Sequence, residues 1–408
     1  MHFPQGASEY DDDGEKLCLQ VNGNIYGAKD GGRMFTDHRD EWLKSIGFKQ
    51  SEYDPALFTR EAEGDMSRVV VGYWIDDGIF AANEAAKDWF EGKLDEQWAR
   101  DNGTGAIKTC EVQEATFAIG ATFEQEDGRI KMHHGKMVES LVADFQEHLG
   151  EKYPYAKTTP FPSGAAVIKA DCPPEHEPLP LRSKYRSGVA SCLYLACTSR
   201  PDIAKHCSEL GKVQANPGEK HWEYLLHLIS YLSGTPNDGV QYVANERSNE
   251  LVAFCDASWA DDQDDRRSTA GYVSYMNGAP VNWHSRIMSA IALSSAESEL
   301  YSATDAAKDV THLRWVINDI TGEPQPGPTT LYEDNNAVIA IASDRNKSIS
   351  TRTKHIAARY FWCRAKVNDG TILLVRCDTT EQVADALTKV SLSRETFTKF
   401  RNRMVTHT

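Results

Sequence analysis

Residues 251–256 read LVAFCD, five apolar or small side chains followed by one aspartate. A short apolar run of this length predicts a buried strand that ends at Asp256. Four later stretches have a similar character and are also predicted strands: 271–275, 290–293, 329–332 and 372–375. Residues 297–320 carry apolar side chains at helical spacing. Three strands followed by alternating helices and strands predict an α/β domain with a mixed sheet.

Two further regions precede this domain. Residues 69–75 are β-branched and aromatic and predict a strand, which an acidic turn at Asp76-Asp77 joins to a second strand. A helix and another hairpin follow, and then a proline-rich linker leads into predicted helices. The predicted domains are 1–150, 151–248 and 249–408, of α+β, helical and α/β character.

The charge of the chain argues both against and for a nucleic-acid partner. The 408 residues hold 44 Lys and Arg against 60 Asp and Glu, a formal net charge of −16. This balance argues against a simple nucleic-acid coat, because phosphate binding relies on cations. Residues 345–403 are the exception, with 13 Lys and Arg against 5 Asp and Glu. A basic end on an acidic body permits a nucleic-acid face.

Neither a membrane segment nor a signal peptide is apparent. No apolar run approaches the ~20 residues that span a bilayer, and residues 1–5 lack the basic start of a signal peptide. The nine cysteines are scattered without a CxxC pair, which is typical of reduced thiols and disfavours a structural zinc site. We therefore expect an intracellular protein without a membrane partner. The sequence does not separate cytoplasm from nucleus.

Four acids of the last domain stand at strand ends or helix starts: Asp256, Glu297, Asp334 and Asp385. Such positions can meet at one end of an α/β sheet. Carboxylates brought together repel one another unless divalent cations compensate them, and Mg²⁺, with Mn²⁺ as an alternative, is the expected ion. Two such ions activate water and stabilise the leaving oxygen in phosphodiester cleavage. The pattern raises the hypothesis of a nuclease metal site.

Each of these acids also has an ordinary structural interpretation. Glu297 fits a capping box with Ser294, and Asp334 fits a helix N-cap. Asp385 suits the first turn of a helix, where an acid answers the helix dipole. Asp256 could simply end a strand. From spacing alone, these structural interpretations are favoured over the catalytic one.

The turn at Asp76-Asp77 is a second candidate site. Adjacent acids between two apolar strands repel each other, and a metal can relieve that repulsion. Asp77-Gly78 is equally a strong signal for an ordinary hairpin turn. Both interpretations stay open.

Several segments resemble one known family. FCDASWA (254–260), DRRSTAGY (265–272), LSSAESE (293–299), DNNA (334–337), TKHI (353–356) and VADALTK (383–389) are similar to the ribonuclease H of copia-type retrotransposon Pol polyproteins. YGAKDGGR (26–33), WIDD (74–77) and RPDI (200–203) are similar, less closely, to the reverse transcriptase of the same polyproteins. The resemblance runs from about residue 17 to residue 399.

The resemblance implies a truncated reverse-transcriptase palm, a helical thumb or connection, and an RNase H-like domain. It implies a metal site formed by four acids: Asp256, Glu297, Asp334 and Asp385. Glu299 is the alternative to Glu297 if the register is off by two residues. The basic candidates for substrate contact are Lys354, His355 and Arg359. A solvated helix face explains these three equally well, and His355 could instead transfer a proton.

The implied activity is Mg²⁺-dependent cleavage of the RNA strand of RNA–DNA hybrids. Asp76 and Asp77 would lie at the polymerase motif, which binds template-primer nucleic acid, and the remainder of the Pol polyprotein is a further candidate partner. The alternative is a catalytically inactive element remnant that only binds nucleic acid or another protein. Retention of all four ribonuclease H acids disfavours that alternative.

We predict that this chain does not extend a primer on an RNA template with Mg²⁺ or Mn²⁺. The family carries a further palm aspartate upstream of the segment that residues 2–6 resemble, and two-metal nucleotidyl transfer needs that ligand. Incorporation of labelled nucleotides measures the activity. Incorporation that disappears in Asp76→Asn would contradict this expectation.

Overall fold

The computed structural model describes residues 31–74, 77–100, 114–150, 153, 155–244, 249–343 and 357–406. The chain divides into two compact units, Met1–Glu114 and Ala115–Thr408. The boundaries expected near residues 150 and 248 fall within the second unit, so the three-domain division stays a prediction. In the described part of the chain no helix is long and apolar enough to cross a membrane.

The first unit contains an antiparallel sheet and two helices. The strands lie in chain order: β1 (Lys49–Gln50), β2 (Leu57–Arg60), β3 (Val69–Trp74) and β4 (Asp77–Ala81). The helices are α1 (Gly31–Ser45) and α2 (Glu84–Arg100). Phe58, Val71 and Phe90 are buried together where helix and sheet meet. The predicted strand over 69–75 is confirmed by β3, and the strand after the acidic turn is confirmed by β4.

The second unit begins with a small antiparallel sheet and a group of helices. Its sheet has the order β5 (Phe117–Ala118), β6 (Ala121–Glu126), β7 (Arg129–His133) and β8 (Val240–Val243). The hairpin of β6 and β7 turns at Asp127 and Gly128, which both take positive φ. The described helices between β7 and β8, with the exception of η2, contribute buried residues to one apolar core. They are α3 (Gly135–Leu149), η2 (Lys169–Asp171), α4 (Arg182–Thr198), η3 (Pro201–Ile203), α5 (Ala204–Gly211) and α6 (Glu219–Ser233).

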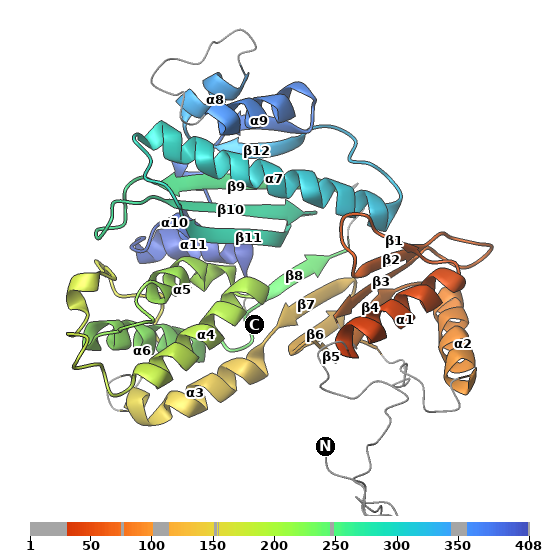
Figure 1. Ribbon diagram of the computed structural model, residues 1–408, viewed down its shortest axis with the longest axis horizontal. Helices are drawn as coiled ribbons and strands as arrows, with labels where there is room; N and C mark the ends of the chain where they lie inside the picture. The colour runs from red at the N-terminus through yellow and green to blue at the C-terminus, as the bar shows by residue number, and fades with distance from the viewer. Residues whose placement is uncertain are drawn as a thin grey trace, which may run out of the picture. The chain divides into compact units, whose positions relative to one another are not determined.

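A five-stranded mixed sheet occupies the rest of the second unit (Figure 1). Its order is β11 (Ala279–Ile287), β10 (Thr269–Met276), β9 (Leu251–Ser258), β12 (Thr329–Glu333) and β13 (Ile372–Arg376). Strand β9 pairs antiparallel with β10 and parallel with β12. The helices are α7 (Ser295–Thr321), α8 (Asn336–Ser343), α9 (Ala357–Asn368), η5 (Thr379–Glu381), α10 (Asp385–Thr388) and α11 (Arg394–Met404). The prediction of an α/β domain with a mixed sheet is confirmed.

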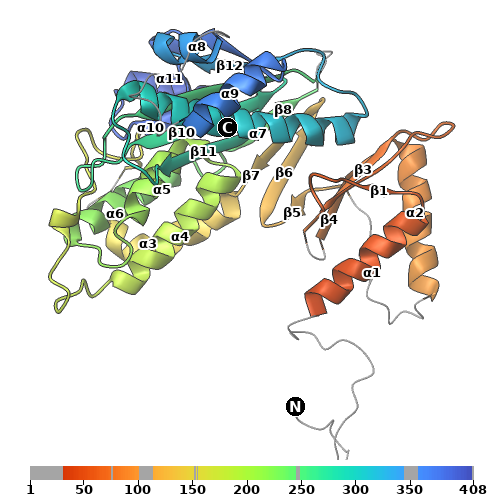
Figure 2. The same ribbon diagram turned by 45° about the horizontal axis from the view of Figure 1, so that its top comes forward.

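Successive residues of β9 face two different cores. Ala253 and Cys255 pack with α7 and α9 on one face of the sheet. Phe254 packs with α10 and α11 on the other face. Figures 1 and 2 show α7 lying across the sheet. Because both faces of this strand are covered, its sequence is apolar until Asp256.

One predicted strand is wrong. Residues 290–293 form no strand, and the third strand is instead β11, which follows β10 after a turn at Asn277-Gly278. Both turn residues take positive φ, and Asn-Gly between two strands is a strong hairpin signal. The run 290–293 is apolar, but it directly precedes Ser294, the N-cap of α7, and therefore leads into a helix.

A buried lysine joins the helices of the second unit to its mixed sheet. The Lys205 side chain of α5 is fully buried. Its Nζ donates to Glu209 at 2.7 Å, to Asp261 at 2.9 Å and to Thr269 at 2.7 Å. Asp261 follows β9 and Thr269 begins β10. This ionic contact therefore crosses the boundary expected near residue 248.

We predict that Lys205→Met lowers the free energy of unfolding by about 3 kcal/mol, because it removes the buried cation from two carboxylates. Urea unfolding followed by circular dichroism measures the change. Lys220→Met, which removes a half-exposed partner of Asp171, is the control and should change stability little. A Lys205→Met protein as stable as the parent would contradict the prediction.

Candidate metal centre

Three carboxylates meet at the end of the two central strands of the mixed sheet. Asp256 lies on β9, Asp334 directly follows β12, and Glu299 lies in the second turn of α7. Each offers one oxygen, and these oxygens lie within 4.8 Å of one another. Within the described ranges no second group of three metal-ligating side chains lies so close together.

Strand pairing brings Asp256 and Asp334 to the same place. Strands β9 and β12 run parallel, with Tyr332 opposite Phe254. Two residues further along each strand come Asp334 and Asp256, at the carboxyl ends of two neighbouring strands. This is the edge at which open α/β sheets place their ligands. The predicted convergence of these two acids is therefore a direct result of the register.

The glutamate that lies in the three-acid group is Glu299, the alternative to Glu297, and the assignment of Glu297 as a metal ligand stays a prediction. Ser294 caps α7 by accepting a hydrogen bond from the Glu297 N–H at 3.2 Å, and the Glu297 carboxylate turns back to accept from the Leu293 N–H at 2.8 Å. Glu297 thus serves the helix start, as its capping interpretation predicts. Glu299 is buried and stands one turn before Ala303, on the stripe of α7 that faces the sheet.

Helix α10 adds three polar groups to the cluster from the opposite face. Asp385 is buried, and its Oδ2 lies 2.7 Å from the Nζ of Lys389. The hydroxyl of Thr388 donates to the Asp256 carboxylate. Helix α10 and the residue after it therefore bring the carboxylate of Asp385, the hydroxyl of Thr388 and the ammonium group of Lys389 next to Asp256.

Glu333 is a further acid beside the cluster, and its sequence position gave no reason to single it out. It ends β12 and is fully buried. Its Oε1 accepts from the Asn335 N–H at 2.9 Å, and its Oε2 accepts from the Cys255 thiol at 3.3 Å. Because successive side chains of a strand face opposite ways, Glu333 and Asp334 leave β12 on different sides. Only Asp334 joins the three-acid group.

Burial raises the pKa of these acids. It raises the pKa of Asp256 to about 7, of Glu333 to about 8 and of Glu299 to about 11. Neighbouring carboxylates add to the effect, since Asp385 acts on Asp256 and Asp256 acts on Glu299. Burial also raises the pKa of Asp385, although Lys389 opposes it. Without further cations the cluster therefore holds protons near neutral pH.

The donor atoms of the cluster fit a divalent cation. Two buried carboxylate oxygens, Oε2 of Glu299 and Oδ1 of Asp385, accept no hydrogen bond. Buried polar atoms are normally paired, so orphaned oxygens beside other acids are suited to a metal ligand. Carboxylate oxygens are also the donors that Mg²⁺ and Mn²⁺ prefer. The acidic cluster is consistent with a divalent metal site.

The structure does not test most of the polymerase and basic candidates. Asp76, Lys354 and His355 lie outside the described residues. Asp77 is exposed at the start of β4, where it pairs with Trp74. Asp77 therefore remains a candidate on the evidence of the sequence only.

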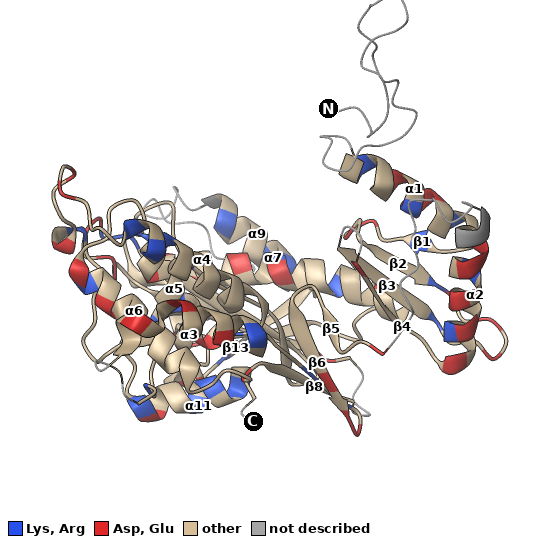
Figure 3. Ribbon diagram, turned by 90° about the horizontal axis from the view of Figure 1, so that it is seen from below, with Lys and Arg blue, Asp and Glu red and all other residues tan. Residues whose placement is uncertain are grey.

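Arg359 and the cations of α11 contact neighbours within the second unit. Arg359 lies 3.1 Å from Asp305 and stacks over the Tyr301 ring at 3.4 Å. In Figure 3 the blue parts of the α11 ribbon mark Lys and Arg positions along this helix. There, Lys399 pairs with Glu381. The positive charge expected at this end of the chain is thus partly used to hold the unit together.

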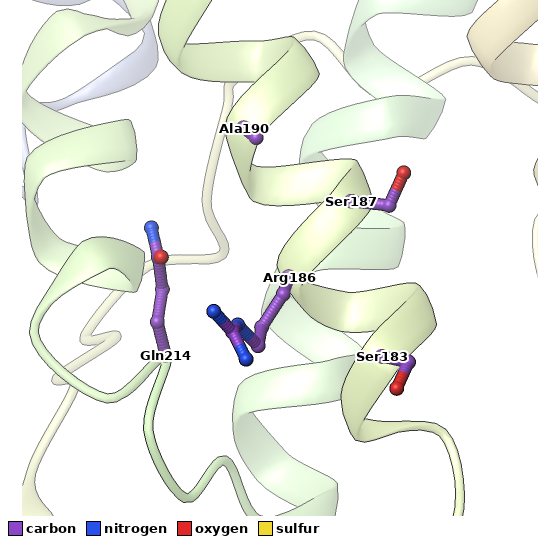
Figure 4. Close-up of a pocket in the computed structure, with 5 residues that line it drawn as sticks. All are labelled: Ser183, Arg186, Ser187, Ala190 and Gln214. Atoms are coloured by element: carbon purple, nitrogen blue, oxygen red, sulfur yellow. The ribbon is translucent and has the colours of Figure 1, made fainter. Parts of the chain in front are cut away.

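A surface hollow on the helices of the second unit differs chemically from the acidic cluster (Figure 4). Its lining residues are Ser183, Arg186, Ser187, Ala190 and Gln214. Figure 4 shows Arg186 and Gln214 turned toward each other. No acid lines this hollow, so its residues are not suited to a Mg²⁺ site.

A five-stranded sheet of this order, with acids at the ends of its first and fourth strands in chain order, defines an RNase H-like α/β domain. The chain is 26% identical over 397 residues to the Retrovirus-related Pol polyprotein from transposon TNT 1-94 of Nicotiana tabacum, covering 96% of this chain and 28% of that polyprotein. It is 27% identical over 406 residues to the corresponding polyprotein from transposon RE1 of Arabidopsis thaliana, covering 99% of this chain and 26% of the relative. Along nearly its whole length the chain is therefore similar to a segment of copia-type retrotransposon Pol polyproteins.

The chain spans about a quarter of the length of these curated relatives. No protein-family model matches it. Among solved structures, LC11-RNase H1 isolated from compost is similar over 35% of this chain and 96% of that chain, with 12% identity and a TM-score of 0.28.

We predict that the metal-free protein loses stability as the pH rises from about 6.5 to about 8. Asp256 and Glu333 hold protons in the folded protein up to about pH 7 and 8, whereas in the unfolded chain such acids ionise near pH 4. The folded state therefore binds more protons in this window, and its free energy of unfolding falls as the pH rises. Thermal unfolding in EDTA measures the fall.

Titration of the buried histidines affects the stability of the protein in a different pH range. Burial lowers the pKa of His134, His206 and His227 to about 4, so their effect on stability is nearly complete by about pH 6.5. Asp256→Asn should flatten the slope, and added Mg²⁺ should restore more stability at pH 8 than at pH 6.5. An unfolding temperature that stays constant or rises across the window would show that the acids do not carry these protons.

Proposed function

We propose that residues 249–408 cleave the RNA strand of RNA–DNA hybrids with Mg²⁺ or Mn²⁺. The observation that carries the proposal is the placement of Asp256, Glu299 and Asp334 within 4.8 Å of one another at the end of β9 and β12. Similarity to copia-type Pol polyproteins supports the same function. The orphaned oxygens of Glu299 and Asp385 supply the coordination that such an ion needs.

Each residue of the cluster would have a distinct role. Asp256, Glu299 and Asp334 would hold one metal ion, and Asp385 would complete a second metal-binding position. A bound ion lowers the pKa of an attacking water and stabilises the departing oxygen. Lys389 compensates the charge of Asp385, which would otherwise repel a substrate phosphate.

Two residues would prepare the cluster for this reaction. Thr388 donates to Asp256 and fixes the direction of its carboxylate. Glu333 is satisfied by the Asn335 N–H and the Cys255 thiol, so it would support the site without binding the ion. Discrimination against DNA would come from contacts to the 2′-OH across the wide, shallow minor groove of the hybrid.

We also propose that residues 1–150 are a partial reverse-transcriptase palm with the start of a thumb, and that residues 151–248 are a thumb or connection. The alignment of the chain with two Pol polyproteins over nearly its whole length supports this assignment. The partners of these regions would be template-primer nucleic acid and the remainder of the polyprotein. Loss of polymerase activity stays a prediction.

We predict that Glu299→Gln lowers the cleavage rate by about two orders of magnitude, whereas Glu297→Gln keeps it within about threefold. Removal of a single group that stabilises developing charge in a transition state, such as one oxyanion-hole donor, typically costs about 10²–10³ in rate. In the hydrogen bonds described above, Glu297 contacts the start of α7. Cleavage of an RNA–DNA hybrid with labelled RNA, measured in Mg²⁺, gives both rates, and circular dichroism checks that both variants fold.

The pair of variants decides between two registers of one motif. Activity that survives Glu299→Gln but disappears in Glu297→Gln would show that the metal ligand is Glu297. A parent protein that binds the hybrid without cutting it would favour the inactive remnant instead. Asp256→Asn should be as inactive as Glu299→Gln, because both acids belong to the same group.

A further inference from the structure

Three large apolar side chains are exposed on the two chain segments that carry Asp256 and Glu299. Trp259, Ile291 and Leu293 have exposed fractions of 51%, 54% and 71%. We refer to these three residues as the apolar rim. Trp259 directly follows β9, and Ile291 and Leu293 lie in the loop that leads into α7. These are the two elements that supply Asp256 and Glu299.

The apolar rim is held in place by hydrogen bonds. The Trp259 indole N–H donates to the Ala292 carbonyl at 3.0 Å, which fixes the ring against the loop between β11 and α7. The Leu293 N–H donates to the Glu297 carboxylate at 2.8 Å. Ala292 itself is buried. The loop between β11 and α7 is therefore held by these hydrogen bonds and by the buried Ala292, while the side chains of Ile291 and Leu293 are exposed.

The apolar rim lies within reach of any duplex that occupies the cluster. Trp259 stands three residues beyond Asp256, a separation of about 10 Å along an extended chain. A duplex with one phosphate at the cluster extends beyond that distance on both sides. The single polar atom of the Trp259 side chain is already bonded to Ala292, so the ring face is what remains to make contact.

We propose that the apolar rim binds the RNA–DNA hybrid through its sugars and exposed base edges, next to the phosphate that is cut. This inference rests on the proposed function, since it places the same substrate at the same site. The cluster is rich in acids, which repel a polyanion, so affinity near it has to come partly from contacts without charge. The wide, shallow minor groove of an A-form duplex offers such contacts.

Salt dependence distinguishes this contact from a contact to phosphate. Each neutralised phosphate steepens the fall of log K with log salt by about 0.9. An apolar contact contributes affinity without changing that slope. Loss of Trp259 should therefore weaken binding equally at low and high salt.

The test measures binding of a labelled RNA–DNA hybrid to the full chain by fluorescence anisotropy, in EDTA and at several salt concentrations. We expect Trp259→Ala and Leu293→Ser each to weaken binding about tenfold with an unchanged salt slope, the size of effect expected for a lost aromatic or apolar contact. Leu293 is mostly exposed, so Leu293→Ser keeps the test valid if Trp259→Ala fails to fold.

Trp315→Ala is the matched control. Trp315 is also an exposed tryptophan, 45% accessible, and it lies on α7 sixteen residues after Glu299, about 24 Å along the helix. It should leave the affinity unchanged. Equal losses in the control and the rim variants, unchanged affinity in both rim variants, or a shallower salt slope in them would overturn the proposal. Intact hybrid binding without cleavage would overturn the proposed function alone.

Discussion

The parallel pairing of β9 with β12 is the constraint on which the rest of the site depends. Its register sets Tyr332 opposite Phe254 and so brings Asp334 beside Asp256. A slip of one residue would turn Asp334 to the other face of the sheet and put Glu333 in its place. Helix α7 then adds Glu299 from one face, and α10 adds an acid from the other. The sheet fixes where the acids meet, and the helices complete the set.

Placing several carboxyl groups together in the interior destabilises the folded chain. Burial of Asp256 and Glu299 disfavours their charged forms, and each acid raises the pKa of the next. Lys389, at 2.7 Å from Asp385, and the hydroxyl of Thr388 offset only part of this cost. Groups that merely capped helices or ended strands would have no need to be buried together. The arrangement is better explained by a cation that binds the folded state and stabilises it by mass action.

The sequence predicts the strands of the sheet better than it predicts which glutamate of α7 joins the acidic cluster. A buried strand is an apolar run, so the strand that carries Asp256 is apparent from the local pattern. Motif register favoured Glu297, but a motif does not say which face of the helix points inward. The spacing of Glu299 to Ala303 and Ala307 on the buried stripe of α7 does carry that information. The burial of Glu333 depends on tertiary contacts far apart in sequence, and no local pattern encodes it.

The net charge of −16 and the residues around the acidic cluster bear on how this protein would bind a nucleic-acid duplex. A protein that bound its duplex mainly by attraction of phosphates would leave its cations facing outward. Here Arg359 pairs with Asp305 and stacks on Tyr301, while Lys399 pairs with Glu381. These two cations are paired within the second unit, and the segments that carry Asp256 and Glu299 expose the apolar side chains of the rim. Binding would then depend on fitted contacts to the duplex and on the cations that the acids hold, so the same ions would govern both affinity and cleavage.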